Sequence, residues 1–330
     1  MTALRVIRPG LLSTVQDLGR TGGLNLGVGT SGAMDPLALA GGNILLRNEE
    51  NAAAIEIPVF PFKVRFERST VFAVTGADCA ARIDETPVLP WWAHRAEAGQ
   101  VLSLSFPKQT TWRATRAYLC IADGVDVPAV LGSRSTQLRG SFGGHEGRPL
   151  RDGDELPTGR SNGRATPGFG LVPPGLALPL EADGVPAVRV LPAAEYDCFT
   201  SSSHQALWST AWKITAQSDR YGYRLAGREL NPLRPLELRS HGIVPGVIQV
   251  PHGGQPIIQM RDAQPSGGYP KIGTVIEADL WRLGQAPIGS SVRFIRCSWD
   301  EALGALADVR HWFANARRLV ELHCGEGGGR

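Results

Sequence analysis

The chain has 330 residues, a length typical of about two domains, each long enough to bury a sizeable core. Its hydrophobic content of 42% and charged content of 20% are ordinary for a globular protein and argue against a wholly disordered chain. The net charge of +3 is too small to indicate nucleic-acid binding, and no Lys/Arg cluster interleaved with aromatic residues is present. Forty glycines and 24 prolines favour a loop-rich β architecture over a helical one.

The first half of the sequence predicts a β domain with one helix. A strand is expected at Leu4–Ile7, before a glycine-rich segment that spans Gly10–Gly32. Asp35 followed by Pro36 is typical of a helix start, with Asp35 as the N-cap. Short β-branched runs predict further strands at Ala54–Ile57, Phe62–Phe66, Val71–Thr75, Val101–Phe106 and Ala117–Ala122.

The segment Arg160–Pro186, rich in Pro, Gly and small residues, is the predicted linker to a second domain. In that domain, strand-like runs are expected at Val247–Val250, Pro256–Met260 and Ile272–Ile276. A capping box formed by Ser298 and Glu301 then predicts a C-terminal helix. The apolar stripe expected on this helix consists of Leu303, Leu306, Val309, Phe313, Ala316 and Val320. We expect the tail, His323–Arg330, to fray.

The two halves begin alike. Leu4–Ile7 resembles Val188–Leu191, and two further pairs follow at nearly constant offsets: Ser31–Asp35 with Ser218–Gly222, and Leu39–Gly41 with Leu225–Gly227. These matches either mark a duplicated β domain or arise by chance among small residues.

Cysteine usage and the N-terminus predict a soluble, cytoplasmic protein. The five cysteines are widely spaced and form no CxxC pair, as expected of reduced thiols: Cys79, Cys120, Cys198, Cys297 and Cys324. The N-terminus lacks the apolar core of a signal peptide, and no run of about 18 apolar residues predicts a membrane span.

The common cofactor and catalytic motifs are absent from the sequence. It contains no GxxxxGK[ST] phosphate loop, no strand–GxGxxG–helix unit, no GxSxG elbow and no HExxH metal pair. It also lacks a Met-Lys-Met biotin-acceptor signal, and no metal site is expected. If ATP or biotin takes part in the reaction, another protein of the complex brings or shares it.

Asp35 and Asn43 lie on the first predicted helix. Asp35 is either a helix N-cap or a ligand-binding carboxylate, and the position before Pro36 already accounts for the N-cap. Asn43 sits one position outside the apolar stripe of that helix. If it is buried, its amide needs hydrogen-bond partners, which a ligand could supply.

Two polar loops are candidates for binding. The Ser133 loop (Leu131–Thr136) combines a glycine, hydroxyls and Arg134, which suits either an anion cradle or an ordinary polar turn. The segment Ser218–Tyr223 is either a binding loop or the site of an internal Asp–Arg pair.

The segment Gly267–Lys271 gives the sharpest functional hypothesis. Its two glycines permit close approach of the backbone to a ligand, or left-handed torsions. Lys271, just before a strand, would present a single ammonium to a carboxylate, phosphate or carbamate. Asp262 could face it as a base or as its counter-ion. The alternative is a glycine turn with a surface ion pair that contributes little.

Several motifs together resemble a known family. They are Ser13–Arg20 (STVQDLGR), Ser31–Asp35 (SGAMD), Thr75–Asp78 (TGAD), Leu131–Thr136 (LGSRST), Ser218–Leu225 (SDRYGYRL) and the stretch Gly242–Phe294. In this order they cover most of residues 4–296. The chain is similar to the family named 5-oxoprolinase C subunit, allophanate hydrolase subunit 2 or KipA, which is related to the carboxyltransferase region of urea carboxylase.

The resemblance implies a mostly β fold of two cyclophilin-like β-barrel domains, at residues 1–180 and 181–330, with few helices besides the C-terminal one. It implies two partner proteins: a KipI-like B subunit and a LamB/YcsF-like A subunit. The implied reaction is opening of 5-oxo-L-proline to L-glutamate with ATP hydrolysis, by a hydrolase that is inactive without its partners. The cysteine usage, charge and hydropathy already predict a cytoplasmic location, with no nucleic-acid or membrane partner.

The same resemblance suggests candidate site residues. The catalytic candidates are Asp262, Lys271 and Tyr269, and the substrate- or anion-binding candidates are Asp35, Asn43, Ser133, Arg134 and Gln249. Asp262 would act as a base or a positioning carboxylate, and Arg134 and Lys271 would hold anionic groups.

The chain departs from the family pattern at His241, where Glu is usual, at Pro265-Ser266, where two threonines are usual, and at Gly41-Gly42. Two other functions therefore stay open. One is a biotin-dependent carboxyltransferase component, with biotin attached to another chain. The other is a KipA-like regulator that binds a KipI-like kinase inhibitor without turnover.

Overall fold

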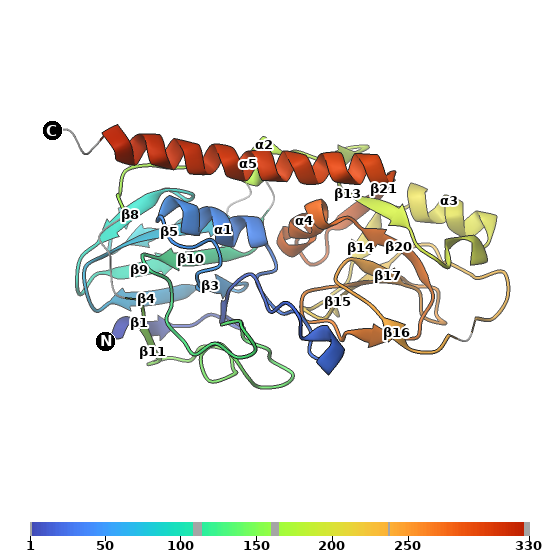
Figure 1. Cartoon of the computed structure of the whole chain (residues 1–330), viewed down its shortest axis with the longest axis horizontal. Coiled ribbons are helices and arrows are strands. Elements are labelled where there is room, and N and C mark those ends of the chain that lie inside the picture. The colour runs from blue at the N-terminus through green and yellow to red at the C-terminus, as the bar shows by residue number, and fades with distance from the viewer. Residues whose placement is uncertain (1, 108–113, 160–164, 237, 327–330) are drawn as a thin grey trace. The chain divides into compact units, whose positions relative to one another are not determined.

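The computed structural model describes residues 2–107, 114–159, 165–236 and 238–326. The chain forms two compact units (Figure 1). The first unit contains residues 1–20, 31–177 and 310–330, and the second contains residues 21–30 and 178–309. The boundary expected at residues 180 and 181 stays a prediction, and Arg160–Arg164 of the expected linker lie outside the described residues.

The first unit is built from two antiparallel sheets. One sheet has the strand order β11-β1-β4-β9-β6-β7, with β11 at Glu155–Pro157, β1 at Thr2–Arg8, β4 at Phe62–Phe66, β9 at Val101–Leu104, β6 at Arg82–Ile83 and β7 at Thr86–Pro87. The other has the order β2-β3-β10-β5-β8, with β2 at Thr14–Gln16, β3 at Ala54–Ile57, β10 at Ala117–Ile121, β5 at Thr70–Gly76 and β8 at Ala93–Ala96. Every strand expected in this half is therefore confirmed, within two residues at its ends.

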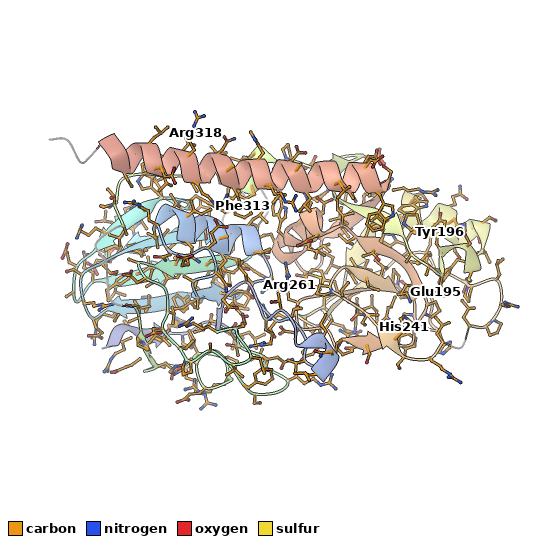
Figure 2. The ribbon with its side chains drawn as sticks, in the orientation of Figure 1. Glu195, Tyr196, His241, Arg261, Phe313 and Arg318 are labelled. Carbon is orange, nitrogen blue, oxygen red and sulfur yellow. The ribbon has the colours of Figure 1, made fainter. Side chains whose placement is uncertain are left out.

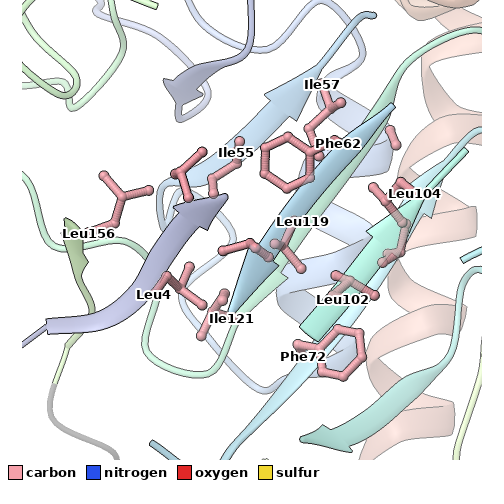
Figure 3. Packing of buried hydrophobic residues seen from close by; sticks show 14 of the residues in the cluster. Leu4, Ile55, Ile57, Phe62, Phe72, Leu102, Leu104, Leu119, Ile121 and Leu156 are labelled. Carbon is pink, nitrogen blue, oxygen red and sulfur yellow. The ribbon is translucent and has the colours of Figure 1, made fainter. Parts of the chain in front are cut away.

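The core of the first unit draws on both sheets (Figure 3). Leu4, Phe62 and Leu102 contribute from the first sheet, and Ile55 and Leu119 from the second. All five side chains are fully buried. Burial of this apolar surface is the main term that holds the sheets together.

Helix α1 (Pro36–Leu45) begins where the sequence predicts, directly after the N-cap Asp35. Asp35 Oδ1 accepts a hydrogen bond from the amide of Ala38 at 2.9 Å, so the predicted N-cap is confirmed. The helix is buried along almost its whole length because it packs on β5 and β10. Gly42 allows this packing, since a Cβ at that position would lie 2.5 Å from the sulfur of Cys120. A four-residue helix, α2 (Pro174–Ala177), ends the main part of this unit.

The second unit contains a closed barrel. Its sheet has the strand order β12-β13-β20-β17-β18-β15-β14-β21, and β21 also pairs in parallel with β13, which closes the ring. The strands are β12 at Glu181–Ala182, β13 at Val185–Pro192, β20 at Lys271–Val275, β17 at Val247–Gln249, β18 at Ile257–Gln259, β15 at Gly222–Ala226, β14 at Trp212–Ile214 and β21 at Ser291–Arg296. The strands expected around Val247, Pro256 and Ile272 are confirmed as β17, β18 and β20.

Smaller elements complete this unit. A two-stranded sheet pairs β16 (His241–Gly242) with β19 (Ser266–Gly267). The helical elements are η1 at Leu24–Leu26, η2 at Tyr196–Cys198, α3 at Ser201–Ser209, η3 at Glu277–Asp279 and α4 at Leu280–Gln285. No helix in the described ranges combines the length and apolar character needed to cross a bilayer.

Helix α5 (Trp299–Glu326) confirms the C-terminal helix and the capping box. The amide of Ser298 donates to Glu301 Oε2 at 2.6 Å, and the amide of Glu301 donates to Ser298 Oγ at 3.3 Å. The predicted stripe was partly wrong, because Leu303 is 62% exposed. The buried positions are Ala305, Val309, Trp312, Ala316 and Val320. The expected fraying from His323 was also wrong up to Glu326, and residues 327–330 lie outside the described part of the chain.

The structure limits the proposed internal repeat. Leu4–Ile7 and Val188–Leu191 both lie in strands, β1 and β13. Leu39–Gly41, however, is helical in α1, whereas Leu225 and Ala226 belong to strand β15. That pair of segments is therefore not a structural repeat. The mostly β fold with a C-terminal helix is confirmed.

Candidate functional site

The Ser133 loop binds an anion that belongs to the chain itself. Asp17 is buried just after β2, and its Oδ1 accepts hydrogen bonds from the hydroxyls of Ser133 at 2.6 Å and Ser135 at 2.5 Å. The amide of Gly19 also donates to Oδ1 at 2.8 Å, and the amide of Arg134 donates to Oδ2 at 2.6 Å. Of the two alternatives that its composition allowed, the loop is thus an anion cradle, and Asp17 fills it.

The side chain of Arg134 does not share the partner of Ser133, which is Asp17. Its Nε donates to the carbonyl of Val127 at 2.9 Å, and its Nη2 lies 3.5 Å from Asp126. The side chain stays 44% exposed, so this guanidinium remains accessible from solvent. Near it lies a cavity of about 380 Å³, lined by Asp126, Val127, Pro128, Val130, Ser141, Phe142, Gly143, Gly144, His145, Glu146, Gly147 and Pro157. None of the predicted site residues lines this cavity.

Asp35 and Asn43 make hydrogen bonds within the first unit. Besides capping α1, Asp35 donates its amide hydrogen to the hydroxyl of Tyr118 at 2.8 Å. The Asn43 amide donates to the carbonyls of Glu50 at 3.1 Å and Ala52 at 2.8 Å, and its Oδ1 accepts from Asn48 at 3.0 Å. These contacts satisfy the fully buried Asn43 without a ligand. A binding role for either residue stays a prediction.

A buried acid lies beside the start of α1. Glu56 Oε2 accepts hydrogen bonds from the amide of Met34 and the hydroxyl of Tyr118, both at 2.8 Å, and Arg116 lies 3.5 Å from Oε1. Burial, followed by the negative charges of Glu56 and Asp35, raises the pKa of Tyr118 well above its ordinary value. The phenol therefore stays protonated and donates to Glu56.

Asp262 pairs with arginine in the second unit, not with Lys271. Its two oxygens accept from Arg220 Nε at 2.9 Å and Nη2 at 3.0 Å, and the Asp262 amide donates to the Arg220 carbonyl at 2.8 Å. Both side chains are buried. The expectation that Asp262 is the counter-ion of Lys271 was therefore wrong. Of the two alternatives left open for Ser218–Tyr223, the structure shows an internal Asp–Arg pair, with Asp262 as its acid.

Lys271 belongs to a cluster that the sequence did not indicate. Its Nζ lies 3.1 Å from Glu195 Oε2 and makes a short contact with Nε2 of His241. The Lys271 amide also donates to Glu195 Oε2, at 3.0 Å. Glu195 precedes η2 and His241 is in β16, two segments distant in sequence (Figure 2). We call Glu195, His241 and Lys271 the lysine cluster.

Gln249 and Tyr269 lie beside the lysine cluster. Gln249 pairs with Lys271 across β17 and β20. Its Nε2 donates to the Tyr269 carbonyl at 3.2 Å and its Oε1 accepts from Gln259 at 3.0 Å. A Cβ at Gly267 would lie 2.8 Å from the Gln249 amide nitrogen, so the backbone lies close to this side chain, and the expected close approach to a ligand stays a prediction. The side chain of Tyr269 is 44% exposed, with its ring edge-on to His252.

The strand register separates the lysine cluster from Asp262. Lys271 lies opposite Gln249, and Gln249 lies opposite Ile257, the first residue of β18. Asp262 comes three residues after Gln259, the last residue of β18. The register therefore places Lys271 level with the start of β18, whereas Asp262 follows the end of that strand. In the described ranges, no group of three or more His, Cys, Asp or Glu side chains is placed to hold a metal ion.

The sequence of the chain matches the family described as Carboxyltransferase domain, subdomain A and B, over residues 26–296. The chain belongs to this family. All eight residues predicted for the site lie inside the matched range, whereas Asp17 lies before it.

Two relatives match this chain over most of its length. The 5-oxoprolinase C subunit of Escherichia coli (strain K12) is 43% identical over 316 residues, which cover 94% of this chain and 96% of that protein. The 5-oxoprolinase C subunit of Haemophilus influenzae is 40% identical over 309 residues, with the same two coverages.

Larger proteins contain a similar region. The urea amidolyase of Lachancea kluyveri is 32% identical, but the chain spans 17% of its length. Among solved structures, the K. lactis urea amidolyase superposes with a TM-score of 0.83 at 28% identity, over 94% of this chain and 20% of that one. The Kluyveromyces lactis urea carboxylase gives the same TM-score and identity, over 94% of this chain and 29% of that one.

Proposed function

We propose that this chain is the C subunit of an ATP-dependent 5-oxoprolinase. The complex would hydrolyse the cyclic amide of 5-oxo-L-proline to L-glutamate, with ATP converted to ADP and phosphate, and the chain would be inactive alone. The observation that carries the proposal is the match, at 43% and 40% identity and over 96% of each relative, to two proteins named as the C subunit of 5-oxoprolinase. The proposed location is the cytoplasm, with which the five free cysteines agree.

The chemistry of lactam opening suits the lysine cluster. An amide carbonyl is a poor electrophile, so a donor that stabilises negative charge on its oxygen assists attack by water. We assign this role to Lys271 and place the exposed side chain of Tyr269 at the substrate. Since Asp262 is held by two hydrogen bonds to Arg220, we propose that it positions this arginine and does not act as a base.

The lysine cluster does not fit a nucleotide. A triphosphate needs several cationic and N–H donors, whereas the charge of Lys271 is balanced by Glu195, 3.1 Å away. We therefore propose that ATP binds elsewhere in the complex, with a KipI-like B subunit and a LamB/YcsF-like A subunit as the proposed partners. ATP would supply the energy for amide hydrolysis when it is bound there.

Reconstitution tests this proposal. The chain is purified with its KipI-like and LamB/YcsF-like partners, and 5-oxoproline-dependent ATP hydrolysis and glutamate release are measured. We expect turnover in the complete mixture, none from this chain alone, and at least a hundredfold loss in Lys271→Ala. Lys213→Ala, which removes an exposed lysine of β14, is the matched control. Absence of turnover in the complete mixture would contradict the proposal.

A second candidate function is biotin-dependent carboxyl transfer. It is favoured by the carboxyltransferase description of the matching family and by the likeness to urea carboxylase. In that case the complex would consume bicarbonate and lose activity on addition of avidin.

A KipA-like regulator would instead bind a KipI-like protein without any turnover.

A further inference from the structure

Glu195 and Lys271 form an ion pair that retains one unused hydrogen-bond donor and one unused acceptor. An ammonium has three N–H donors, and the Nζ of Lys271 has two partners, Glu195 Oε2 and His241 Nε2. The second carboxylate oxygen, Glu195 Oε1, accepts no hydrogen bond from the described residues. One N–H donor of Nζ and one acceptor oxygen, Oε1, therefore remain on this pair, whose Nζ and Oε2 are 3.1 Å apart.

His241 orients the lysine. Its Nδ1 lies 3.0 Å from the carbonyl of Arg239, an acceptor only, so Nδ1 carries the proton and donates. Nε2 of the neutral ring is then an acceptor and receives a hydrogen from Lys271. This chain of contacts fixes two of the three ammonium hydrogens and so fixes the direction of the third.

We propose that the Glu195–Lys271 pair binds a cyclic amide through both of its polar groups. In a small lactam ring the amide is cis, so its N–H and C=O leave the ring on the same side, whereas in a trans amide they point in opposite directions. The carbonyl oxygen accepts the remaining N–H of Lys271, and the lactam N–H donates to Glu195 Oε1. Glu195 and Lys271 contact the substrate, and His241 is a positioning residue.

The charge and exposure of the pair agree with binding of the uncharged lactam group, and not of the carboxylate that 5-oxo-L-proline also carries. Because the two charges cancel, a carboxylate gains little from Lys271 and is repelled by Glu195. The side chains of Lys271 and Glu195 are 16% and 17% exposed, so a small molecule reaches them while most of the surrounding water is excluded. This inference rests on the proposed function, and it specifies the substrate class that the site selects.

Protection of Lys271 from reductive methylation tests the inference on the full chain. The sequence has only four lysines, Lys63, Lys108, Lys213 and Lys271, so mass spectrometry follows each one separately, and the exposed Lys63 and Lys213 serve as references. We expect 2-pyrrolidinone to protect Lys271 selectively. N-methyl-2-pyrrolidinone, which lacks the N–H, should need at least about a tenfold higher concentration for the same protection. Acetate should protect poorly.

Variants separate the roles in the cluster. Glu195→Gln keeps the size of the side chain but places an NH₂ donor toward the lactam N–H, so we expect about tenfold weaker protection by 2-pyrrolidinone. His241→Ala should weaken protection, and His241→Gln, which restores an acceptor oxygen, should recover most of it. Lys213→Ala should leave protection of Lys271 unchanged. If Glu195→Gln fails to fold, the comparison of the two pyrrolidinones on the unaltered chain still decides.

Equal protection by the two pyrrolidinones, or stronger protection by acetate, would overturn the inference. Its failure is distinguishable from failure of the proposed function. Turnover of 5-oxoproline by the complex without any protection of Lys271 would overturn the inference alone. Protection by 2-pyrrolidinone in a chain whose complex gives no turnover would overturn the proposed function and support the lactam site.

Discussion

Two aspartates show how strongly buried carboxylates organise the loops of this protein. Asp17 accepts four hydrogen bonds and holds the Ser133 loop, 116 residues further along the chain. Asp262 holds Arg220 through two hydrogen bonds. A buried donor that loses its acceptor carries the full cost of its desolvation. Each carboxylate therefore stabilises its unit by satisfying several buried donors at once.

Replacing Asp17 tests the first of these roles. In Asp17→Asn, an NH₂ group meets hydrogen-bond donors, and we expect the free energy of unfolding to fall by about 2–4 kcal/mol. Urea unfolding measures this value. Asp126→Asn, at a residue that is 58% exposed and pairs only loosely with Arg134, should change it by less than about 0.5 kcal/mol. Equal effects of the two substitutions would contradict the role assigned to Asp17.

Asp262→Asn distinguishes a positioning carboxylate from a base. Because it removes the charge that balances the buried Arg220 guanidinium, we expect a loss of about 3–5 kcal/mol in the free energy of unfolding. The double variant with Arg220→Met should recover part of that loss. A variant that loses turnover in the complex while unfolding at the same urea concentration would contradict the stabilising role assigned to Asp262.

The sequence predicted residues whose partners are local and missed those whose partners are distant. Asp35 was predicted as an N-cap because the capped amide is three residues away. The composition of the Ser133 loop allowed an anion cradle or a polar turn, and it did not reveal that Asp17 supplies the anion. Glu195 and His241 carry no local signal at all, because only the tertiary fold brings them to Lys271.

Helix α5 was predicted correctly at its start, but the prediction of its buried face was partly wrong. The capping box lies within four residues, so the sequence contains all of it. The buried face is chosen by neighbours that the sequence pattern does not reveal. Trp312, absent from the predicted stripe, lies edge-on to Trp91 with ring centroids 6.0 Å apart, and donates to the carbonyl of Val172 at 3.2 Å.

The capping box makes the start of α5 sensitive to pH. Hydrogen bonds from the amide of Ser298, and then from its hydroxyl, hold the pKa of Glu301 below its ordinary value of 4.5. A lowered pKa means that the stabilisation is present above pH 4.5 and is lost as the pH falls through the lower, folded-state value. Glu301→Gln, which keeps a capping acceptor without a charge, should remove this loss. The free energies of unfolding of the unaltered chain and of Glu301→Gln, measured at pH 7 and pH 3, check this prediction.

Gly41 is required for close packing on α1. A Cβ there would lie 2.8 Å from the Trp91 ring and 3.0 Å from the Trp312 ring. We expect Gly41→Ala to lower the free energy of unfolding by about 1 kcal/mol, because overpacking outweighs the better helix propensity of alanine. Gly304→Ala on α5, where nothing lies within 4 Å, should raise it by about 0.5–1 kcal/mol. Thermal unfolding compares the two, and a stabilised Gly41→Ala would contradict the packing argument.

For the whole molecule, the positions of the longer strands were partly predictable but the arrangement of the strands was not. Alternation and β-branched runs place the nine expected strands within two residues of their observed ends, and the other strands of the described residues were not predicted. The parallel pairing of β13 with β21, which closes the barrel, joins residues about a hundred positions apart and leaves no local trace. The resemblance to a known family supplied the expectation of barrels, and the residue pattern alone did not.

The thiols report on the integrity of the first unit. Burial raises the pKa of Cys120 to about 12 and that of Cys79 further still, with Asp78 adding to the second shift. Since both pKa values are raised, the free energy of unfolding should fall as the pH rises above 9.0, the ordinary thiol value.

At pH 8, iodoacetamide should modify the half-buried Cys198 and Cys324 first, and Cys79 and Cys120 only on unfolding. Mass spectrometry of native and urea-treated protein checks the order.

The last helix also determines when the first unit can be completed. Ala316 and Val320 of α5 form a buried cluster with Ile44, packed against Phe169 and Leu171. A ribosome synthesises the chain from its N-terminus, so every strand of the first unit leaves the exit tunnel long before these two residues exist. The first unit therefore cannot complete this cluster until the end of the chain has been made. A nascent chain halted before residue 310 would leave this apolar patch uncovered, and such a patch is what chaperones recognise.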